Sequence, residues 1–286
     1  MKEVWKKVNC YKNRKQSNKI PLEIGEWTAR FHEKLTPPWV KNNTDLEIER
    51  VVAEDSSPLA SNYLLKQNNN TAPGKDNITY SILAQLPLQA QQALLNIYNL
   101  IWSNKIPIPT EWQDYIVIPI QKPGKPQEHE DSYRPISLAS CVMKTYERLI
   151  RNRLEHWAEQ NDKLPFNQYG FRRSRSTQEA VSILISDILI SFTKNKTISA
   201  VFVDIKGAYD NVIMEILHAQ LVKIGIPQKM ADNIISMYTN RQLYLKINDD
   251  IIGPRVASLG LPQGSILSPI TSYIMHQILT KAFKNR

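Results

Sequence analysis

The sequence predicts an α+β protein in which helices pack on a small, mostly antiparallel sheet. The first observation is a long amphipathic pattern over residues 142–160, typical of a helix with one buried face. The second is a pair of short apolar runs, 115–119 and 200–203, whose length and β-branched content indicate strands. The third is a pair of segments, 243–248 and 251–256, whose separation by two residues predicts a β-hairpin.

The N-terminal part is predicted to be helical around one turn-rich stretch. Residues 1–19 are basic and are interpreted as a solvated tail. Apolar side chains at helical spacing predict a helix within 23–35, and the acidic stretch 42–57 is interpreted as a helix or a linker. Turn-forming residues gather at 68–78, and a second helical pattern covers 82–101.

The strand at 115–119 leads into a Pro-Gly turn that presents two lysines, at 122–125. The helix over 142–160 follows, and its apolar stripe is interpreted as core rather than as a binding surface. The stripe consists of Val142, Met143, Tyr146, Leu149, Ile150, Leu154 and Trp157.

An arginine-rich loop, 167–176, comes next. Ser176 and Glu179 have the spacing of a capping box, in which the serine side chain and the glutamate side chain satisfy free N–H groups at a helix start. The sequence therefore predicts a helix that begins here and continues to about Phe192.

The stretch 199–210 is the one around which the chain is organised. Its apolar run 200–203 predicts a strand buried on both faces, with Asp204 at or near its C-terminal end. Asp210 is expected to cap a helix over 211–224, which Gly225 ends. The rest of the chain is predicted as a helix at 230–238, the hairpin, a Gly-Pro-Gly loop at 259–264 and a helix over 265–283.

Composition narrows the class of partner. The 286 residues carry a net charge of +9 with a pI of about 9.4, which favours nucleic acid or an acidic membrane surface. Residues 1–20 contribute +6 of this charge, so the body is only mildly basic. Two cysteines are too few for a disulfide framework or a zinc site, and no run approaches a membrane helix or a secretory signal. A reducing intracellular compartment is expected, in the nucleus or the cytoplasm.

Single residues leave the chemistry open. An aspartate after a strand is most often a cap or turn residue, so Asp204 alone does not indicate catalysis. A basic turn such as 122–125 is usually only solvated, although Arg134 on the return makes a phosphate-binding interpretation equally reasonable. The arginines at 172–175 lie close in sequence to Tyr169 and Phe171, a combination that suits nucleic-acid contacts but is also common on ordinary surfaces.

The order of six short blocks resembles that of the reverse transcriptases of non-LTR, LINE-type retrotransposons. The likeness covers about residues 68–270, and each block alone is loose. The blocks are APGKD (72–76), IPIQKPGK (118–125), SYRPISL (132–138), QYGFRRSRST (168–177), VFVDIKGAYD (201–210) and GLPQGSILSP (260–269).

The resemblance implies a right-hand polymerase with fingers and a partial palm. It divides the chain into a basic, linker-like segment at 1–45, a helical fingers extension at 46–112 and a fingers and palm region at 113–286. The implied reaction adds a deoxynucleotide to a DNA primer 3′-OH on an RNA template, through two Mg²⁺ ions. By position in the family motif, Asp204 is the catalytic metal ligand and Ile205 offers its backbone carbonyl.

The resemblance also assigns a nucleotide pocket. Gly207 and Ala208 would bring backbone N–H groups close to the triphosphate. Tyr209 corresponds to the ring that excludes a ribose 2′-OH, while its position is equally that of a first buried helical residue. Gln263 and Gly264 match the loop that lines the pocket and supports the template base.

Basic residues would complete the implied site. Arg134 matches the fingers arginine over the incoming phosphates. Lys122 is the candidate for its lysine partner, with Lys125 as the alternative and as a nucleic-acid contact. The residues implied to face the template or primer backbone are Arg172, Arg173 and Arg175.

Two departures from the family pattern stand out. Lys75 and Asn77 occupy places usually held by Pro and Gly in the first block. The Tyr/Phe-Ala-Asp-Asp block, which supplies the other metal carboxylates, is not found after Pro269, and Asp249-Asp250 lies in the hairpin turn instead. We therefore expect a fragment that does not polymerise alone.

One alternative function of a different class remains: a non-catalytic, nucleic-acid-binding relic of the same fold. A group II intron maturase is a same-fold alternative, disfavoured by the block at 72–76 and by the N-terminal linker-like segment. The expected partners are an RNA template, a DNA primer and deoxynucleotide triphosphates, with no membrane. Oligomeric state is left open by the sequence.

Overall fold

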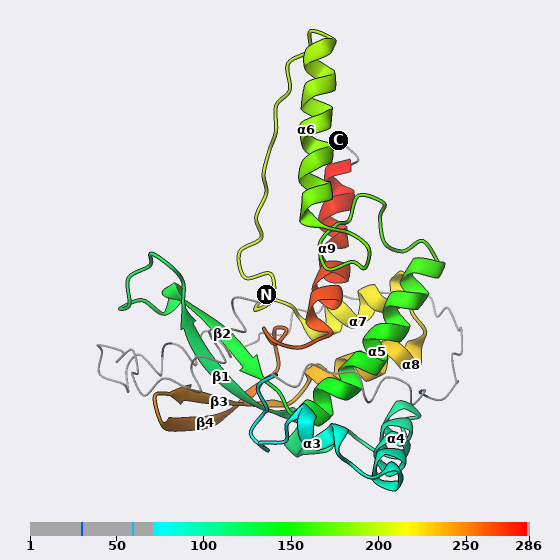
Figure 1. Cartoon of the computed structure of the whole chain (residues 1–286), viewed down its shortest axis with the longest axis vertical. Coiled ribbons are helices and arrows are strands. Elements are labelled where there is room, and N and C mark those ends of the chain that lie inside the picture. The colour runs from blue at the N-terminus through cyan, green and yellow to red at the C-terminus, as the bar shows by residue number, and fades with distance from the viewer. Residues whose placement is uncertain (1–29, 31–58, 60–70, 285–286) are drawn as a thin grey trace.

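The computed structural model of the chain describes Arg30, Leu59 and residues 71–284 (Figure 1). The basic tail 1–19 and the predicted helices within 23–35 and 42–57 lie outside the described residues, apart from the single position Arg30. Figure 1 shows the sheet on one side of the molecule and most of the helices on the other.

The described strands form one mixed sheet in the order β2-β1-β3-β4. β1 pairs antiparallel with β2 and parallel with β3, and β3 pairs antiparallel with β4. The expectation of an α+β protein with a small, mostly antiparallel sheet therefore agrees with the structure. The strands are β1 (Asp114–Gln121), β2 (Tyr133–Leu138), β3 (Arg241–Ile247) and β4 (Asp250–Ala257).

Two prolines indicate how the sheet is bounded. Pro119 of β1 lies opposite Pro135 of β2, and the pairing of β1 with β3 ends before this point, at Val117. A proline cannot donate a ladder hydrogen bond, so both positions suit places where no further strand needs the N–H. β2 is consequently an edge strand whose outer side is available to a loop.

The helices predicted within 71–284 are present with small changes of boundary. The pattern over 82–101 is divided at Leu86–Pro87 into two helices, and short 3-10 turns occur at Thr110–Gln113 and Glu130–Ser132. The helices are α3 (Tyr80–Ala84), α4 (Leu88–Trp102), α5 (Cys141–Gln160), α6 (Thr177–Thr193), α7 (Met214–Lys223), α8 (Gln228–Tyr238) and α9 (Ser268–Lys284).

α5 lies at the centre of the main apolar core, as its stripe predicts. Side chains from α4, α7, α8 and α9 join it in one cluster. Tyr98 stacks on Tyr146 with ring centroids 5.5 Å apart. Each hydroxyl has a partner, since Tyr98 donates to the carbonyl of Val142 at 2.8 Å and Tyr146 donates to Asn233 Oδ1 at 2.6 Å. These two tyrosines therefore bury their apolar rings without leaving either hydroxyl unpaired.

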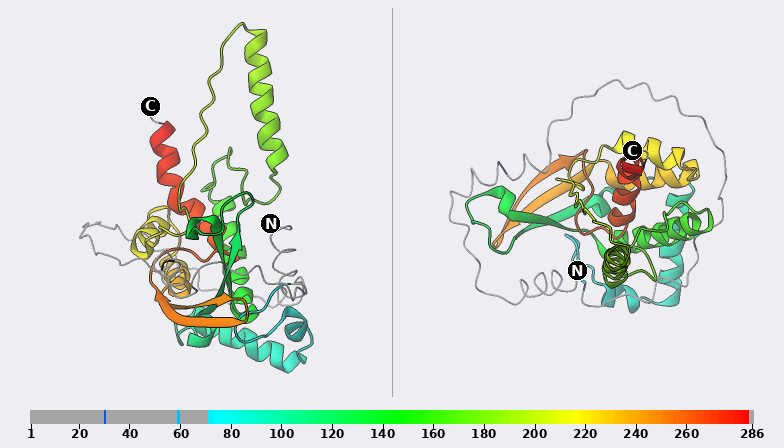
Figure 2. Two further views of the ribbon diagram at one scale, coloured as in Figure 1. Left: turned by 90° about the vertical axis from the view of Figure 1, so that its left-hand side faces the viewer. Right: turned by 90° about the horizontal axis from the view of Figure 1, so that it is seen from above.

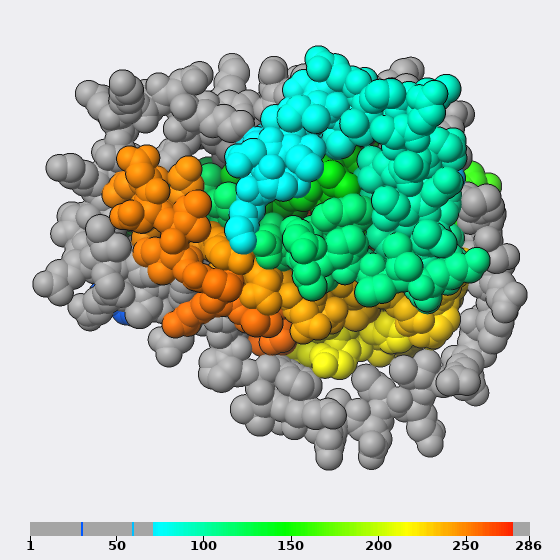
Figure 3. All heavy atoms as spheres, turned by 90° about the horizontal axis from the view of Figure 1, so that it is seen from below, coloured from blue at the N-terminus to red at the C-terminus, as the bar shows by residue number. Residues whose placement is uncertain are grey.

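The turn at 71–79 ties the sheet to the helices. Lys75 donates to Asp114 at 2.8 Å and lies over the Tyr244 ring at 3.8 Å, so it contacts both β1 and β3. Ser140, the N-cap of α5, donates to Asp76 at 2.5 Å. Seen from below, the turn at 71–79 lies beside the β3–β4 hairpin (Figure 3). The unusual Lys75 therefore has a structural role in this chain.

The strand predicted at 200–203 is not formed, and this prediction is wrong for the structure. The segment is extended but unpaired, and Val201, Phe202 and Val203 are 85%, 83% and 67% exposed. An apolar, β-branched run becomes a strand only when another strand supplies backbone partners, and the described strands pair among themselves. Asp204 is consequently exposed on a coil rather than held at the end of a buried strand.

α6 begins at the predicted capping box, which is confirmed by bonds in both directions between Ser176 and Glu179. The helix projects beyond the body of the molecule, and the extended chain after it returns to the body (Figures 1 and 2). No α6 residue is buried, although the helix is rich in apolar side chains.

The start of α7 also differs from the prediction. The helix begins at Met214 with Ile213 as N-cap, so Asp210 does not cap it. Asp210 instead accepts a hydrogen bond from Gln263 across the candidate site. The segment 211–213 stays outside the helix, and the backbone carbonyl of Val212 bonds to the loop that carries Gln263.

Truncating a buried leucine of α5 should cost far more than truncating an exposed one of α6. Leu154 is fully buried and Leu189 is 57% exposed. We expect Leu154→Ala to lower the free energy of unfolding by about 2–5 kcal/mol, because it opens a cavity in the core. Leu189→Ala should change it by less than about 0.5 kcal/mol. Urea unfolding followed by tryptophan fluorescence measures both, and equal effects would contradict the assignment of the core.

Candidate active site

Two motifs that are far apart in sequence form one backbone-bonded unit. The N–H of Gly260 donates to the carbonyl of Val212 at 2.8 Å, and the N–H of Leu261 donates to the carbonyl of Tyr209 at 2.8 Å. Gly260 has φ +74°, and a side chain there would lie 2.9 Å from the carbonyl oxygen of Asp210. Only glycine fits this close approach without strain. The turn at 207–212 and the loop at 259–264 are therefore held together.

Gln263 connects this unit to the sheet. Its side-chain amide donates to Asp210 Oδ1 at 3.2 Å, and its backbone carbonyl accepts from the N–H of Ser137 at 2.8 Å. The loop thus bonds to β2 at its edge. Gly264 follows with φ +142°, and a side chain there would clash with the carbonyl oxygen of Ser137. Arg134 lies on the same strand, three residues before Ser137, and is exposed.

A small pocket lies where these parts meet. Its lining includes Pro135 and Ser137 of β2, Asp210, Arg241 and Gln263. The pocket measures about 30 Å³, roughly the volume of one water molecule. A nucleotide cannot be enclosed by it and would have to lie on the surface that it opens to.

The residues implied to approach a triphosphate lie in the same turn. Gly207 has φ +65°, and the N–H of Asn211 donates to its carbonyl at 3.0 Å, which closes the turn. Ala208 and Tyr209 are half-buried, and Tyr209 packs against the helical core. Burial raises the pKa of the Tyr209 hydroxyl, so this ring stays neutral near pH 7. The two interpretations of Tyr209, core residue and gate, are compatible with this position.

Asp204 is not one of the residues that form the bonded unit. It is exposed, it lies six residues before Asp210, and it does not line the small pocket. Ile205 is 37% exposed. In the part of the chain that the structure describes, no three acidic, histidine or cysteine residues gather into a group that could hold a metal ion. One exposed carboxylate does not fit a two-metal site by itself.

The basic residues of the β1–β2 ribbon occupy its tip. The N–H of Lys122 donates to the carbonyl of Ser132 and its Nζ donates to the carbonyl of Asp131, both at 2.7 Å. Ile120 pairs with Arg134, so Lys122 and Arg134 lie diagonally on one face of the ribbon. Lys125 is exposed at the turn. The predicted pair, Arg134 and Lys122, therefore lies on one face of the β1–β2 ribbon.

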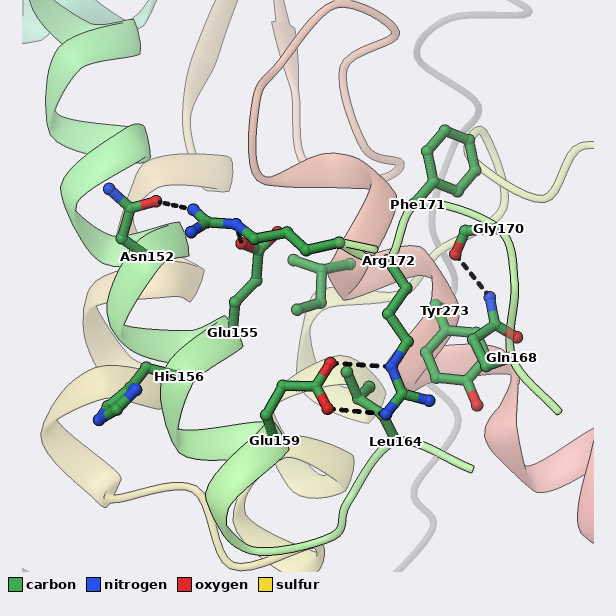
Figure 4. Close-up of a pocket in the computed structure, with 12 residues that line it drawn as sticks. Asn152, Glu155, His156, Glu159, Leu164, Gln168, Gly170, Phe171, Arg172 and Tyr273 are labelled. Atoms are coloured by element: carbon green, nitrogen blue, oxygen red, sulfur yellow. Dashed lines mark hydrogen bonds and ion pairs between the residues drawn. The ribbon is translucent and has the colours of Figure 1, made fainter. Parts of the chain in front are cut away.

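The arginine-rich loop is bonded to α5 (Figure 4). Arg172 donates to both carboxylate oxygens of Glu159, at 2.8 and 2.7 Å, and this partner lowers the pKa of Glu159. Arg173 donates to Asn152 at 2.7 Å and lies 2.9 Å from Glu155. These contacts line a pocket of about 230 Å³ that Tyr273 of α9 also borders.

The three arginines differ in what they can reach. The Arg172 side chain is 13% exposed and its guanidinium is bonded to Glu159, whereas the Arg173 side chain is 70% exposed. Arg175 lies over the rings of Phe166 and Tyr169, with its guanidinium carbon 4.8 and 5.3 Å from their centroids. Arg172 therefore fixes the loop to α5, Arg173 is the exposed cation, and Arg175 is half-buried against two rings.

A row of charged residues along α5 carries these contacts and was not recognised in the sequence. Glu147, Arg151, Glu155 and Glu159 recur every four residues, which aligns them on one side of a helix. Glu147 also falls between Met143 and Ile150 of the apolar stripe. A charged residue within an apolar helical face was the signal that could have identified it.

Arg241 is a further residue that the sequence does not single out. It opens β3 and is 3% exposed, and its guanidinium donates into the loop before Gln263. No sequence pattern distinguishes it from a surface arginine at the start of a strand.

Among the described residues, no helix has both the length and the apolar composition needed to cross a membrane.

The chain is similar in sequence to a known protein family and to several known proteins. Residues 120–286 match the family described as "Reverse transcriptase (RNA-dependent DNA polymerase)". The chain is 32% identical over 263 residues, 92% of its length, to a probable RNA-directed DNA polymerase from transposon BS of Drosophila melanogaster. It is 32% identical over 72% of its length to a probable RNA-directed DNA polymerase from transposon X-element of the same species.

A third relative is the RNA-directed DNA polymerase from mobile element jockey of Drosophila melanogaster, 30% identical over 78% of this chain. The chain spans only 28%, 23% and 24% of the length of these three relatives, in the order given.

Replacing Gly264 should loosen the contact between the loop and β2. In Gly264→Ala the new methyl group would meet the Ser137 carbonyl, at a φ that alanine rarely adopts. We expect exchange of the Ser137 amide hydrogen to rise about tenfold. Gly170→Ala is the control, because its methyl group would find only Gln168 Nε2 at 3.6 Å. Hydrogen exchange read by NMR measures both, and equal Ser137 protection in the two variants would rule out the close packing.

Proposed function

The chain belongs to the reverse transcriptase family, and we propose that it forms the part of a non-LTR transposon's RNA-directed DNA polymerase that receives the incoming nucleotide. The polymerase adds deoxynucleotides to a DNA primer 3′-OH on an RNA template. One observation carries the proposal for this chain: the bonded unit of the turn 207–212, the loop 259–264 and the edge of β2. It joins the residues that the family motif assigns to nucleotide binding.

The proposed roles follow the chemistry of each group. Arg134 and Lys122 would bind the triphosphate, since both are cations on one face of the ribbon. The backbone N–H groups of Gly207 and Ala208 would donate to phosphate oxygens. Tyr209 would exclude a ribose 2′-OH by its ring, which is braced by the helical core.

Gln263 and Gly264 would support the template base beside the nucleotide. Gln263 is suited to this because its side chain and its carbonyl are both bonded to neighbouring elements, which limits its motion. A pre-organised side chain loses little conformational entropy when a ligand binds. The glycine after it allows the loop to approach the β2 backbone.

Mg²⁺ is proposed as the cofactor, with Asp204 and the carbonyl of Ile205 as ligands. Among the described residues no further acidic, histidine or cysteine side chains gather around Asp204 into a metal-binding group, so this one carboxylate does not fit a two-metal site by itself. We therefore propose that these 286 residues do not extend a primer by themselves. The other carboxylates of the family would have to be supplied by further polypeptide.

Template and primer would bind through backbone contacts without sequence preference. Lys125 and Arg173 are exposed cations suited to phosphate, and the half-buried Arg175 with Tyr169 offers a stacking surface. Arg172 would act by anchoring the loop. We further propose the right-hand arrangement, with fingers in 46–112 and fingers and palm in 113–286, and an intracellular site of action.

A second candidate is a nucleic-acid-binding relic that keeps this fold without catalysis. The observation that favours it is the lack of a metal-binding group among the described residues. The two candidates differ in whether activity appears once carboxylates are supplied, and not in nucleic-acid binding.

Primer extension tests the catalytic proposal. The purified chain with Mg²⁺, a DNA primer and an RNA template should give no extension above background. A chimera that joins it to the Ala-Asp-Asp region of a relative should extend the primer, and Asp204→Asn should reduce that rate at least about 100-fold. Asp249→Asn, in the hairpin turn, is the control and should stay within about twofold.

Two results would contradict the proposed incomplete site or the proposed catalytic role. Strong extension by the chain alone, lost in Asp204→Asn, would overturn the claim that the site is incomplete. A chimera that binds the RNA–DNA hybrid tightly but does not extend it would favour the relic.

Arg134 should matter for nucleotide binding because it is proposed to grip the phosphates. Arg134→Ala should weaken binding of a deoxynucleoside triphosphate by about 10- to 100-fold, the usual effect of losing charged hydrogen bonds. Arg255→Ala removes another exposed arginine, from β4, and should leave the affinity unchanged within about twofold. Fluorescence titration of the two variants gives the comparison. Equal affinities would remove Arg134 from the site.

A further inference from the structure

The loop that carries Gln263 is held at its start by a buried arginine. Arg241 Nη2 donates to the carbonyls of Leu259 and Gly260, both at 2.6 Å, and Nε donates to the carbonyl of Tyr238 at 2.8 Å. The residue is 3% exposed. A guanidinium presents several donors in a fixed plane, so one side chain can hold three carbonyls that a lysine could not satisfy in the same geometry.

The far end of the loop is held by a buried carboxylate. Glu147 of α5 is fully buried, and its Oε2 accepts from the N–H of Ile266 at 2.7 Å. Arg151, one turn further along α5, lies 3.4 Å from the carbonyl of Ile266. Burial raises the pKa of Glu147, while the Ile266 N–H and the nearby Lys144 oppose that rise.

Burying an ionisable side chain at each of these two positions costs folding free energy, so the bonds that the two side chains make indicate their roles. An uncompensated charge in a protein interior is strongly destabilising, so buried charges are found where they make specific bonds. The guanidinium at one end donates to carbonyl oxygens, and the carboxyl oxygen at the other end accepts from an N–H. Each therefore matches the backbone group it meets, and the loop between them carries Gln263.

We propose that Arg241 and Glu147 are positioning residues that clamp the loop 259–266, so that Gln263 keeps its bonds to Asp210 and to β2. This inference rests on the proposed function, in which Gln263 supports the template base beside the nucleotide. Neither residue is proposed to touch the nucleotide. Their effect passes through the backbone of the loop.

Amide hydrogen exchange tests the clamp without any need for activity. The informative amides are those of Leu261 and Ser137, because neither bonds directly to the Arg241 or Glu147 side chain. In Arg241→Met and in Glu147→Leu, we expect both amides to exchange about tenfold faster than in the wild-type chain. Loosening at these two positions shows that the whole loop has moved.

Milder variants keep the test decisive if those proteins fold poorly. Glu147→Gln keeps an acceptor for the Ile266 N–H, and Arg241→Lys keeps the positive charge with fewer donors, so both should give intermediate exchange. Asn233→Leu is the matched control. It removes a buried polar residue of α8 that bonds to Tyr146 and does not contact the loop. It should lower overall stability and leave the Leu261 and Ser137 amides as protected as in the wild type relative to its global unfolding.

Nucleotide binding is measured on the same set of variants. Binding of a deoxynucleoside triphosphate should weaken about tenfold in Arg241→Met and Glu147→Leu. Binding of an RNA–DNA hybrid should change less than about twofold, because the accessible cations are untouched. Rescue in Arg241→Lys or Glu147→Gln toward wild-type affinity would support positioning rather than general loss of structure.

Failure of the clamp and failure of the proposed function give different results in these experiments. Unchanged exchange at Leu261 and Ser137 in every clamp variant would overturn the clamp, whatever happens to binding. A wild-type chain that binds no nucleotide while its loop loosens in the variants would overturn the proposed function and leave the clamp supported. Equal loosening in Asn233→Leu would also overturn the clamp.

Discussion

The pair of backbone hydrogen bonds from Gly260 and Leu261 to the 207–212 turn is the constraint on which the candidate site depends. It joins segments about fifty residues apart and leaves no room for a side chain at Gly260. Through Gln263 the same loop reaches Asp210 and the edge of β2. Backbone bonds of this kind fix position more tightly than side-chain contacts, because few rotatable bonds lie between the partners.

The helix α5 has two functions that its sequence combines. Its apolar stripe forms the centre of the helical core. Its charged row bonds to the Gln263 loop through Glu147 and Arg151, and to the arginine-rich loop through Glu155 and Glu159. A residue spacing of four keeps these groups on one side of the helix. One rigid element thus sets the positions of the two loops that we propose to bind the nucleotide and the nucleic acid.

α6 and the segment after it show the opposite situation. Both are rich in apolar side chains, and both are exposed in the described structure. A helix that is apolar on most of its surface is typical of a buried position, and a β-branched run is typical of a paired strand. Local preference is clear in both segments, yet it does not by itself provide a covering surface or a partner strand.

The sequence alone determined the features that depend on near neighbours: the α5 stripe, the capping box at Ser176, the β3–β4 hairpin and the order of motifs that indicates the family. Tertiary structure decided the rest. It left 200–203 unpaired, directed Asp210 to Gln263 instead of to a helix N-terminus, bound Arg172 to Glu159 and buried Arg241 and Glu147 at the ends of one loop. The reason is physical, since a carboxylate or a guanidinium bonds to whatever group the fold brings within reach, and that group is distant in sequence.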